Sequence, residues 1–163
     1  MSRSSIVHDT FVIERTYPAA PARVFAAFAD AELKRRWFLI DASMAATESY
    51  QNDFRVGGKE TSRFRFTGNT PGGSPAGTMM GNDSIYMDIV ENERIVVAYT
   101  MLVGDYRMST SLATFQLVPE GEGTRLVFTE QAVFFDKSDG LRLRKEGWTY
   151  LLGKLADALA SVV

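Results

Sequence analysis

The chain has 163 residues, of which 45% are hydrophobic and 23% are charged, with a formal net charge of −2 and no cysteine. This length suits one domain with a sizeable core, and the charge excludes a general attraction to nucleic acid or to an anionic membrane surface. The lack of cysteine excludes disulfides, a thiol nucleophile and sulfur ligands for a metal. We therefore expect a single domain over residues 1–163 that does not bind nucleic acid.

Neither an export signal nor a membrane span is visible in the sequence. The first residues, "MSRSSIVHDTFVIERTY", lack an apolar stretch long enough for a signal peptide. Nowhere do about 18 consecutive apolar residues occur, which is the length that a spanning helix needs. We expect a cytoplasmic protein without a membrane span.

The N-terminal part of the sequence predicts one strand followed by two short helices. Residues 6–17 have the side-chain alternation of a strand. In "PARVFAAFA", proline stands in the first helical turn and apolar residues recur at helical spacing. Asp30 can cap a second helix, "AELKRRWF", in which we interpret the Lys34-Arg35-Arg36 run as the solvated face.

Residues 48–134 predict one strand after another. The short polar segments at 92–93, 104–105 and 119–123 separate alternating runs, as hairpin turns do in an antiparallel meander. The glycine- and proline-rich segment 67–78 is the one long loop that we expect here.

Gly57 and Gly58 follow a basic segment, which is also how some phosphate-binding loops look. Such a loop needs a helix directly after the glycines, whereas residues 59–67 alternate aromatic and charged side chains, as a strand does. We interpret the glycines as a two-residue hairpin turn with positive φ at both positions, in which Arg55 opposes Glu60.

The register of this hairpin decides where its charged pair lies. Strict alternation puts Arg55 and Glu60 on the same face as Phe64 and Phe66, unless a bulge resets the register. The alternative is that Arg55 and Glu60 form a solvent-facing pair near the turn. The sequence favours this alternative because the ends of hairpins are usually exposed to solvent.

The C-terminal part predicts one long amphipathic helix. From residue 138 onward, leucine and tryptophan recur at spacings of three and four. Ser138 or Asp139 can cap this helix. The order is therefore strand, two short helices, antiparallel strands and a long helix, which is an α+β fold. Only the last helix is long enough to cover the apolar face of a curved sheet.

Five segments in this order resemble the family named for activators of the ATPase of the 90-kDa heat-shock protein, in the START/SRPBCC helix-grip superfamily. They are "ERTYPAAPARVFAAFADAELKRRWF", "FRVGGKETSRF", "ENERIVVAYTM", "GTRLVFTEQ" and "GWTYLLGKLADAL". The resemblance spans almost the whole chain. It implies a curved antiparallel sheet wrapped around the long C-terminal helix, with two short helices after the first strand.

The resemblance also implies what such a domain does. Helix-grip proteins, which include polyketide cyclases and plant pollen allergens, commonly bind a small hydrophobic molecule or lipid between sheet and helix, and a minority are enzymes. The co-chaperones that name the family carry an additional N-terminal domain. We expect no such domain here, because the helix-grip pattern begins within the first dozen residues.

Few residues suggest catalysis or metal binding. His8 is the only histidine, and no nucleophile motif such as G-x-S-x-G accompanies it. One histidine without cysteine leaves only carboxylates as metal ligands, and these show no ligand spacing. We expect neither a metal nor a cofactor.

Glu130 is the most notable polar candidate, because it shares its strand alternation with Leu126, Phe128, Ala132 and Phe134. A carboxylate in this row either enters a cavity or marks where the strand leaves the core. If it is enclosed it needs a partner, since an unpaired buried charge is costly. It could then act as a general acid or base, or hold a ligand hydroxyl.

We expect the ligand to contact side chains of the inner strand faces and of the C-terminal helix, although plain core packing is the alternative for the apolar ones. The candidates are Trp37, Arg55, Phe64, Phe66, Met87, Tyr99, Met101, Phe115, Phe128, Glu130, Trp148 and Leu152. Further polar candidates are Tyr86, Asp88, Tyr106 and Arg107.

The leading hypothesis is a protein that binds a small, mainly hydrophobic molecule, with the loop at 67–78 beside the mouth of the cavity. The second is a cyclase- or hydrolase-like enzyme that uses Glu130, or Arg55 with Glu60, for acid–base chemistry. The third is a co-chaperone-type interaction module whose partner is a chaperone. The sequence leaves open whether the protein is a monomer or a homodimer.

Overall fold

The structure is a computed structural model that describes residues 3–68 and 75–161. Its elements are β1 (Val7–Tyr17), α1 (Pro21–Ala29), α2 (Ala31–Phe38), β2 (Ala45–Asn52), β3 (Lys59–Phe66), β4 (Met79–Val90), β5 (Arg94–Val103), β6 (Tyr106–Glu120), β7 (Gly123–Phe134) and α3 (Gly140–Ser161). This order confirms the predicted strand, helix pair, meander and long helix. The long loop expected at 67–78 joins β3 to β4, and its residues 69–74 lie outside the described residues.

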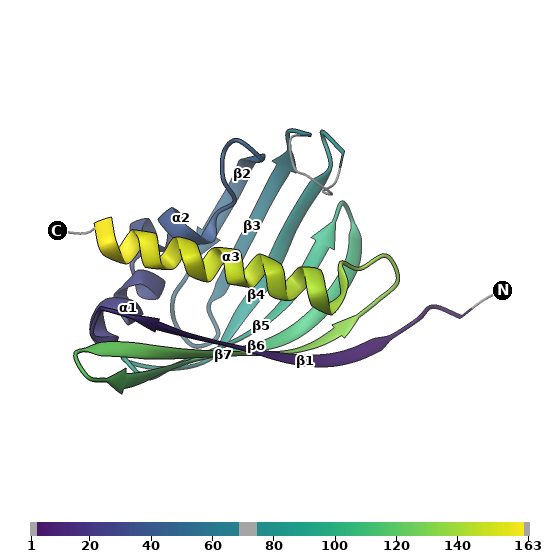
Figure 1. The fold of residues 1–163 in the computed structure, drawn as a ribbon. Helices are drawn as coiled ribbons and strands as arrows, with labels where there is room; N and C mark the ends of the chain where they lie inside the picture. The colour runs from purple at the N-terminus through teal and green to yellow at the C-terminus, as the bar shows by residue number, and fades with distance from the viewer. Residues whose placement is uncertain (1–2, 69–74, 162–163) are drawn as a thin grey trace.

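The seven strands form one antiparallel sheet in the order β1-β7-β6-β5-β4-β3-β2. From β2 to β7 each strand pairs with the next along the chain, whereas β1 pairs with β7. The sheet is curved, and α3 lies across its concave face, with α1 and α2 beside the C-terminal half of α3 (Figure 1). The predicted helix-grip fold is therefore confirmed. In the described ranges, no helix has both the length and the apolar composition that a membrane crossing requires.

Local signals set the start of the helices as the sequence predicts. Pro21 occupies the first turn of α1, where its missing N–H costs no hydrogen bond. The Asp30 side chain accepts hydrogen bonds from the backbone N–H groups of Glu32 and Leu33, both at 3.0 Å, and so caps α2. Before α3, the Ser138 hydroxyl accepts from the Gly140 N–H at 3.4 Å, whereas the Asp139 carboxylate faces Arg144.

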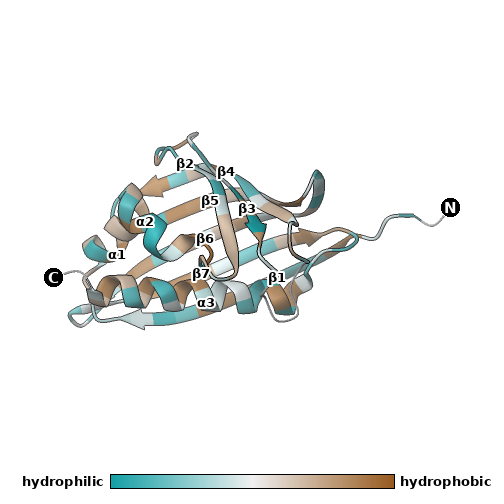
Figure 2. Ribbon diagram, turned by 90° about the horizontal axis from the view of Figure 1, so that it is seen from above, coloured by the Kyte–Doolittle hydropathy of each residue, from teal (hydrophilic) through white to brown (hydrophobic). Residues whose placement is uncertain are grey.

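One end of the space between helices and sheet is filled by aromatic rings. Phe28 of α1 lies 4.9 Å from Phe115 of β6, and Phe128 of β7 lies 4.6 Å from Trp148 of α3, measured between ring centroids. Trp37 of α2 joins this cluster at 4.9 Å from Phe28. Hydrophobic residues alternate with hydrophilic ones along α3 (Figure 2), and those that face the sheet pack on this cluster. The helices are therefore held on the sheet at this end by a dry core.

The predicted two-residue hairpin at Gly57-Gly58 is wrong. In the structure β2 ends at Asn52, which pairs with Glu60, so residues 53–58 form a longer connection. The glycines do make a turn, because the Gly58 N–H donates to the Arg55 carbonyl at 2.8 Å. Of these two glycines, only Gly57 has a positive φ, of 82°. The turn is therefore of the kind that needs one glycine, at its third position.

This loop is also anchored to β4. The Gly57 N–H donates to the Tyr86 carbonyl at 2.7 Å, and the Tyr86 N–H donates to the Gly58 carbonyl at 3.0 Å. A Cβ added at Gly58 would lie 2.0 Å from the Asp53 carbonyl oxygen, so this close approach requires glycine. The alternation of side chains is lost across the loop, which separates the predicted pair: Arg55 is exposed and Glu60 is buried on the inner face.

The packed end of α3 supplies a test of the fold. Leu155 is fully buried, whereas Leu143 on the same helix is 46% exposed. We expect Leu155→Ala to lower the free energy of unfolding by about 2–5 kcal/mol, because the substitution leaves a cavity in a dry core. The control Leu143→Ala should change it by less than about 0.5 kcal/mol. Urea unfolding followed by circular dichroism measures both values, and equal effects would contradict the docking of α3 described here.

Candidate functional site

A cavity of about 680 Å³ lies between the concave face of the sheet and α3, beyond the packed end. Its walls come from α2 and the segment after it, from the inner faces of β3 to β6, and from α3. Most of this wall is apolar and much of it is aromatic or methionine side chain. The main apolar contributors are Phe64, Phe66, Met80, Met101, Phe115 and Trp148.

A band of polar side chains crosses the floor of this cavity at right angles to the strands. Neighbouring strands are in register here, so that inner-face residues of successive strands stand side by side. The residues in one row are Glu60, Ser84, Tyr99 and Ser111. The next row holds Ser62, Asn82 and Ser109, with the apolar Met101 between the last two. Each end of the band carries a buried cation with a carboxylate partner.

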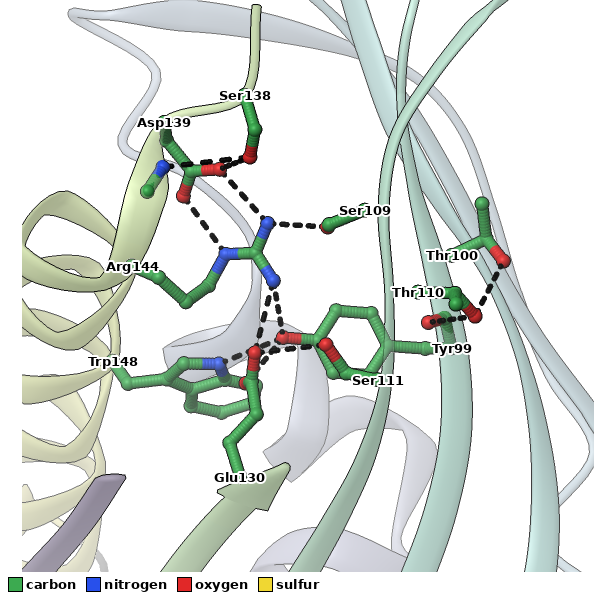
Figure 3. Close-up of polar contacts among 11 residues, drawn as sticks. Tyr99, Thr100, Ser109, Thr110, Ser111, Glu130, Ser138, Asp139, Arg144 and Trp148 are labelled. Atoms are coloured by element: carbon green, nitrogen blue, oxygen red, sulfur yellow. Dashed lines mark hydrogen bonds and ion pairs between the residues drawn. The ribbon is translucent and has the colours of Figure 1, made fainter. Parts of the chain in front are cut away.

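At the end of the band nearest the N-terminus of α3, Arg144 reaches down to the sheet (Figure 3). Its guanidinium makes two hydrogen bonds to the Asp139 carboxylate, from Nε and Nη2, each of 2.9 Å. Its Nη1 donates to Glu130 Oε2 at 2.9 Å and to the Tyr99 hydroxyl at 3.1 Å. Nη2 also donates to the Ser109 hydroxyl at 2.6 Å. All five N–H groups of the side chain are thus used.

The partners of Arg144 are joined to one another. Tyr99 donates its hydroxyl proton to Glu130 Oε1 and accepts from the Trp148 indole N–H at 3.2 Å. Ser111 donates to Glu130 Oε2 at 2.9 Å. Burial raises the pKa of the Tyr99 phenol, against the lowering effect of Arg144. Burial lowers the pKa of Arg144, but Tyr99, Asp139 and Glu130 together raise it, so the guanidinium stays charged.

At the other end of the band, Lys34 of α2 meets Glu60 of β3. The Lys34 Nζ lies 3.1 Å from Glu60 Oε2, and both side chains are about 95% buried, with 5% and 4% of their surface exposed. The Tyr50 hydroxyl donates to Glu60 Oε2 at 2.6 Å. The ammonium also lies over aromatic rings, at 4.4 Å from the Phe38 centroid and 5.0 Å from that of Trp37.

Half of the side chains predicted to contact a ligand line this cavity. They are Phe64, Phe66, Tyr99, Met101, Phe115 and Trp148. Trp37, Phe128 and Leu152 lie in the packed core instead. Glu130 is 0% exposed and lies behind Tyr99 and Arg144, so it supports the wall rather than forming it.

The structure places the two remaining predicted residues outside the cavity. Arg55 is in the β2–β3 loop, where it pairs with Asp53 and borders a separate shallow depression. Met87 is 54% exposed and points to the outer face, because side chains alternate along β4 and its neighbour Tyr86 is buried on the other face.

The further polar candidates also lie away from the cavity wall. Tyr86 is buried, and its hydroxyl donates to Asn52 Oδ1 at 2.7 Å. Asp88 pairs with Arg94 on the surface. Tyr106 and Arg107 begin β6 and are exposed.

Sequence reasoning missed the two buried cations. The sequence predicts a solvated face for Lys34, yet this side chain is 4% exposed. The sequence does contain a sign of this burial: Lys34 lies one turn before Trp37 and Phe38, which puts it on the apolar side of α2. Arg144 stands four residues before Trp148 on α3, and the same spacing places it toward the sheet.

Residues 18–160 match the protein family described as activator of Hsp90 ATPase homolog 1-like protein. The chain belongs to this family. The resemblance read from the five sequence segments is thereby confirmed. Among curated proteins, no sequence matches this member of the family.

Solved structures share the fold of this family member over nearly its full length. Protein Mll3558 of Rhizobium loti is 44% identical, with a TM-score of 0.80, over 94% of this chain and 99% of that one. An uncharacterised protein of Rhizobium leguminosarum is 37% identical, with a TM-score of 0.88, over 99% and 100%. Protein CV1439 of Chromobacterium violaceum, at 23% identity, a TM-score of 0.72 and coverage of 92% and 96%, is similar in fold.

The burial of the Glu130–Arg144 pair gives a testable difference between two glutamates. We expect Glu130→Ala to lower the free energy of unfolding by about 3–5 kcal/mol, because it leaves part of a buried guanidinium without its partner. The control is Glu14→Ala, whose carboxylate pairs with Arg125 at 2.8 Å on the surface. This change should cost no more than about 1 kcal/mol. Chemical denaturation measures both, and similar losses would contradict the enclosed network.

Buried phenols make the fold sensitive to alkali. Burial is the main cause of the raised pKa of four tyrosines: Tyr17, Tyr50, Tyr86 and Tyr99. Because their folded pKa exceeds the unfolded value near 10, their contribution to stability is complete below about pH 10 and is lost as the pH rises further. We expect their phenolate absorbance to develop together with the loss of the circular dichroism signal. Ionisation of all tyrosines before unfolding would contradict this.

Proposed function

We propose that the protein binds a small, mainly hydrophobic molecule in the cavity between the sheet and α3. The observation that carries this proposal is the form of the cavity, a space of about 680 Å³ with apolar walls and a few converging polar groups. Binding sites for small molecules have this size and this composition. Membership of the helix-grip fold is consistent with such a role.

The uneven packing of the interior supports a binding role for the open part. Protein interiors are normally close-packed, and an unfilled apolar space costs stability. The same sheet and helix are tightly filled at the end where Phe115, Phe128 and Trp148 meet. Four methionines, whose unbranched side chains adapt to different shapes, line the open part: Met44, Met80, Met101 and Met108.

The enzymatic alternative has less support. Both oxygens of Glu130 accept hydrogen bonds, one of them from a guanidinium, and the carboxylate is not exposed to the cavity. A general acid or base must reach the proton that it transfers. Arg55 and Glu60, the other proposed acid–base pair, lie apart: Arg55 pairs with Asp53 in the exposed loop, whereas Glu60 is buried in β3 and pairs with Lys34.

A co-chaperone role is supported only by the description of the matched family. The contacts described above give no reason to prefer a chaperone over a small molecule. A cytoplasmic location stays a prediction, and the sequence leaves the choice between monomer and homodimer open.

Two methionines on opposite faces of the sheet provide a test of the cavity. Met101 of β5 lines the cavity, whereas Met87 of β4 points outward. We expect Met101→Trp to weaken binding of an aromatic polyketide-like compound tenfold or more, because the larger ring occupies the space. Met87→Trp should leave the affinity unchanged. Calorimetric titration measures both.

The compound for this titration comes from a library of fatty acids, sterols and polyketide-like aromatics, screened by chemical shifts of the Trp148 indole N–H. No shift across the library would contradict the proposal. Equal weakening by both substitutions would mean that binding occurs elsewhere.

A further inference from the structure

Two cationic side chains are buried in the wall of the cavity, and they differ in how many of their donors are already used. Arg144 lies at the α3 end of the polar band and Lys34 at the α2 end. The five N–H groups of Arg144 are all engaged by four partners from the protein. Arg144 therefore has no donor left for a bound molecule.

Lys34 is in the opposite situation. Its ammonium has three N–H donors, and among the described residues the Glu60 carboxylate is its only hydrogen-bond acceptor, at 3.1 and 3.4 Å to the two oxygens. The remaining surroundings of Nζ are the rings of Phe28, Trp37 and Phe38, at 5.4, 5.0 and 4.4 Å. Rings attract a cation but satisfy its donors poorly, so this ammonium can still donate into the cavity.

A second donor stands close to the same place. Ser84 of β4 is paired across the sheet with Glu60 and lines the cavity. Its hydroxyl oxygen accepts a hydrogen bond from Asn82 Nδ2 at 2.7 Å. No described residue accepts the hydroxyl proton in return. The α2 end of the band thus presents two donors, and the side chain acceptors nearby are already occupied.

The charge at this end is already balanced. Lys34 and Glu60 form a pair of net charge zero, both nearly excluded from water. A ligand carboxylate placed beside Lys34 would add a second anion to one cation in a site of low dielectric, which is costly. An uncharged oxygen acceptor would complete the hydrogen bonds without adding a charge.

We propose that the bound molecule is an uncharged hydrophobic carbonyl compound, such as an aromatic ketone or quinone, whose oxygen accepts hydrogen bonds from Lys34 Nζ and Ser84 Oγ. This inference rests on the proposed function and specifies its ligand class. The hydrophobic body of the molecule lies along the Phe64, Met101 and Trp148 side of the cavity.

Three probes of similar shape test the ligand class: methyl naphthyl ketone, ethylnaphthalene and naphthoate. They share one ring system and differ in the group that meets Lys34, which is an uncharged acceptor, a hydrocarbon or an anion. We expect the ketone to bind the wild-type chain at least about tenfold more tightly than either of the others, since a hydrogen bond from a charged donor is worth this much. Calorimetric titration at neutral pH gives the three dissociation constants.

A pair of variants then locates the preference. Lys34→Met alone leaves Glu60 buried without a cation, so the double variant Lys34→Met/Glu60→Gln is used, which removes both charges and keeps an acceptor for Tyr50. We expect it to bind the ketone and ethylnaphthalene within about threefold of each other. The control Lys59→Met removes an exposed lysine that stands next to Glu60 on β3, and this variant should keep the full preference for the ketone. Circular dichroism checks that both variants are folded.

The outcomes separate this inference from the proposed function. Equal binding of the ketone and ethylnaphthalene to the wild-type chain would overturn the inference and leave a hydrophobic binding site. Preference for naphthoate would also overturn it and would indicate an anionic ligand. Retention of the ketone preference in the double variant would show that Lys34 does not supply it. Failure of all three probes to bind at millimolar concentration would overturn the proposed function as well.

Discussion

The Arg144 guanidinium is the interaction on which the arrangement of the cavity depends. It joins α3 to side chains of β5, β6 and β7 through Tyr99, Ser109 and Glu130, and to the start of the helix through Asp139. Replacing a buried pair of this kind by apolar side chains is often neutral or stabilising, but the directional hydrogen bonds of the pair hold its members in one geometry. It fixes the height and direction of the N-terminal half of α3 above the sheet. An apolar contact could achieve the same attachment only by filling the space.

The two halves of α3 are consequently held in different ways. The C-terminal half rests on a closely packed aromatic core and lies beside α1 and α2 (Figure 1). The N-terminal half borders the cavity and is held by the polar network (Figure 3). The polar band on the sheet ends in a fully satisfied cation at one side and in a partly satisfied one, Lys34, at the other. The two ends of the cavity therefore differ, and the unused hydrogen-bond donors lie at the end beside α2.

The sequence predicts what local interactions decide. The capping by Asp30, the proline at the start of α1 and the order of strands depend on residues close together in the chain, and they are found as predicted. The register around Gly57 differs from the prediction because Gly57 and Gly58 pair with Tyr86 of β4 instead of forming a two-residue hairpin turn. The local spacing puts Lys34 on the apolar side of α2, but its partner Glu60 is 26 residues further on, so the buried pair cannot be predicted from the helix alone. Side chains on strands beyond such a loop can be assigned to a face only when the loop's length is known.

The pairing of β1 with β7 affects how the chain is made as well as how it is held. Val7 lies opposite Phe134 and Tyr17 opposite Thr124, so β1 is synthesised long before β7, the strand with which it pairs. Until then its backbone N–H and C=O groups are open to other chains. Pairing of β1 with β7 is therefore a late step in biosynthesis, and it joins residues distant in sequence, which makes it slow.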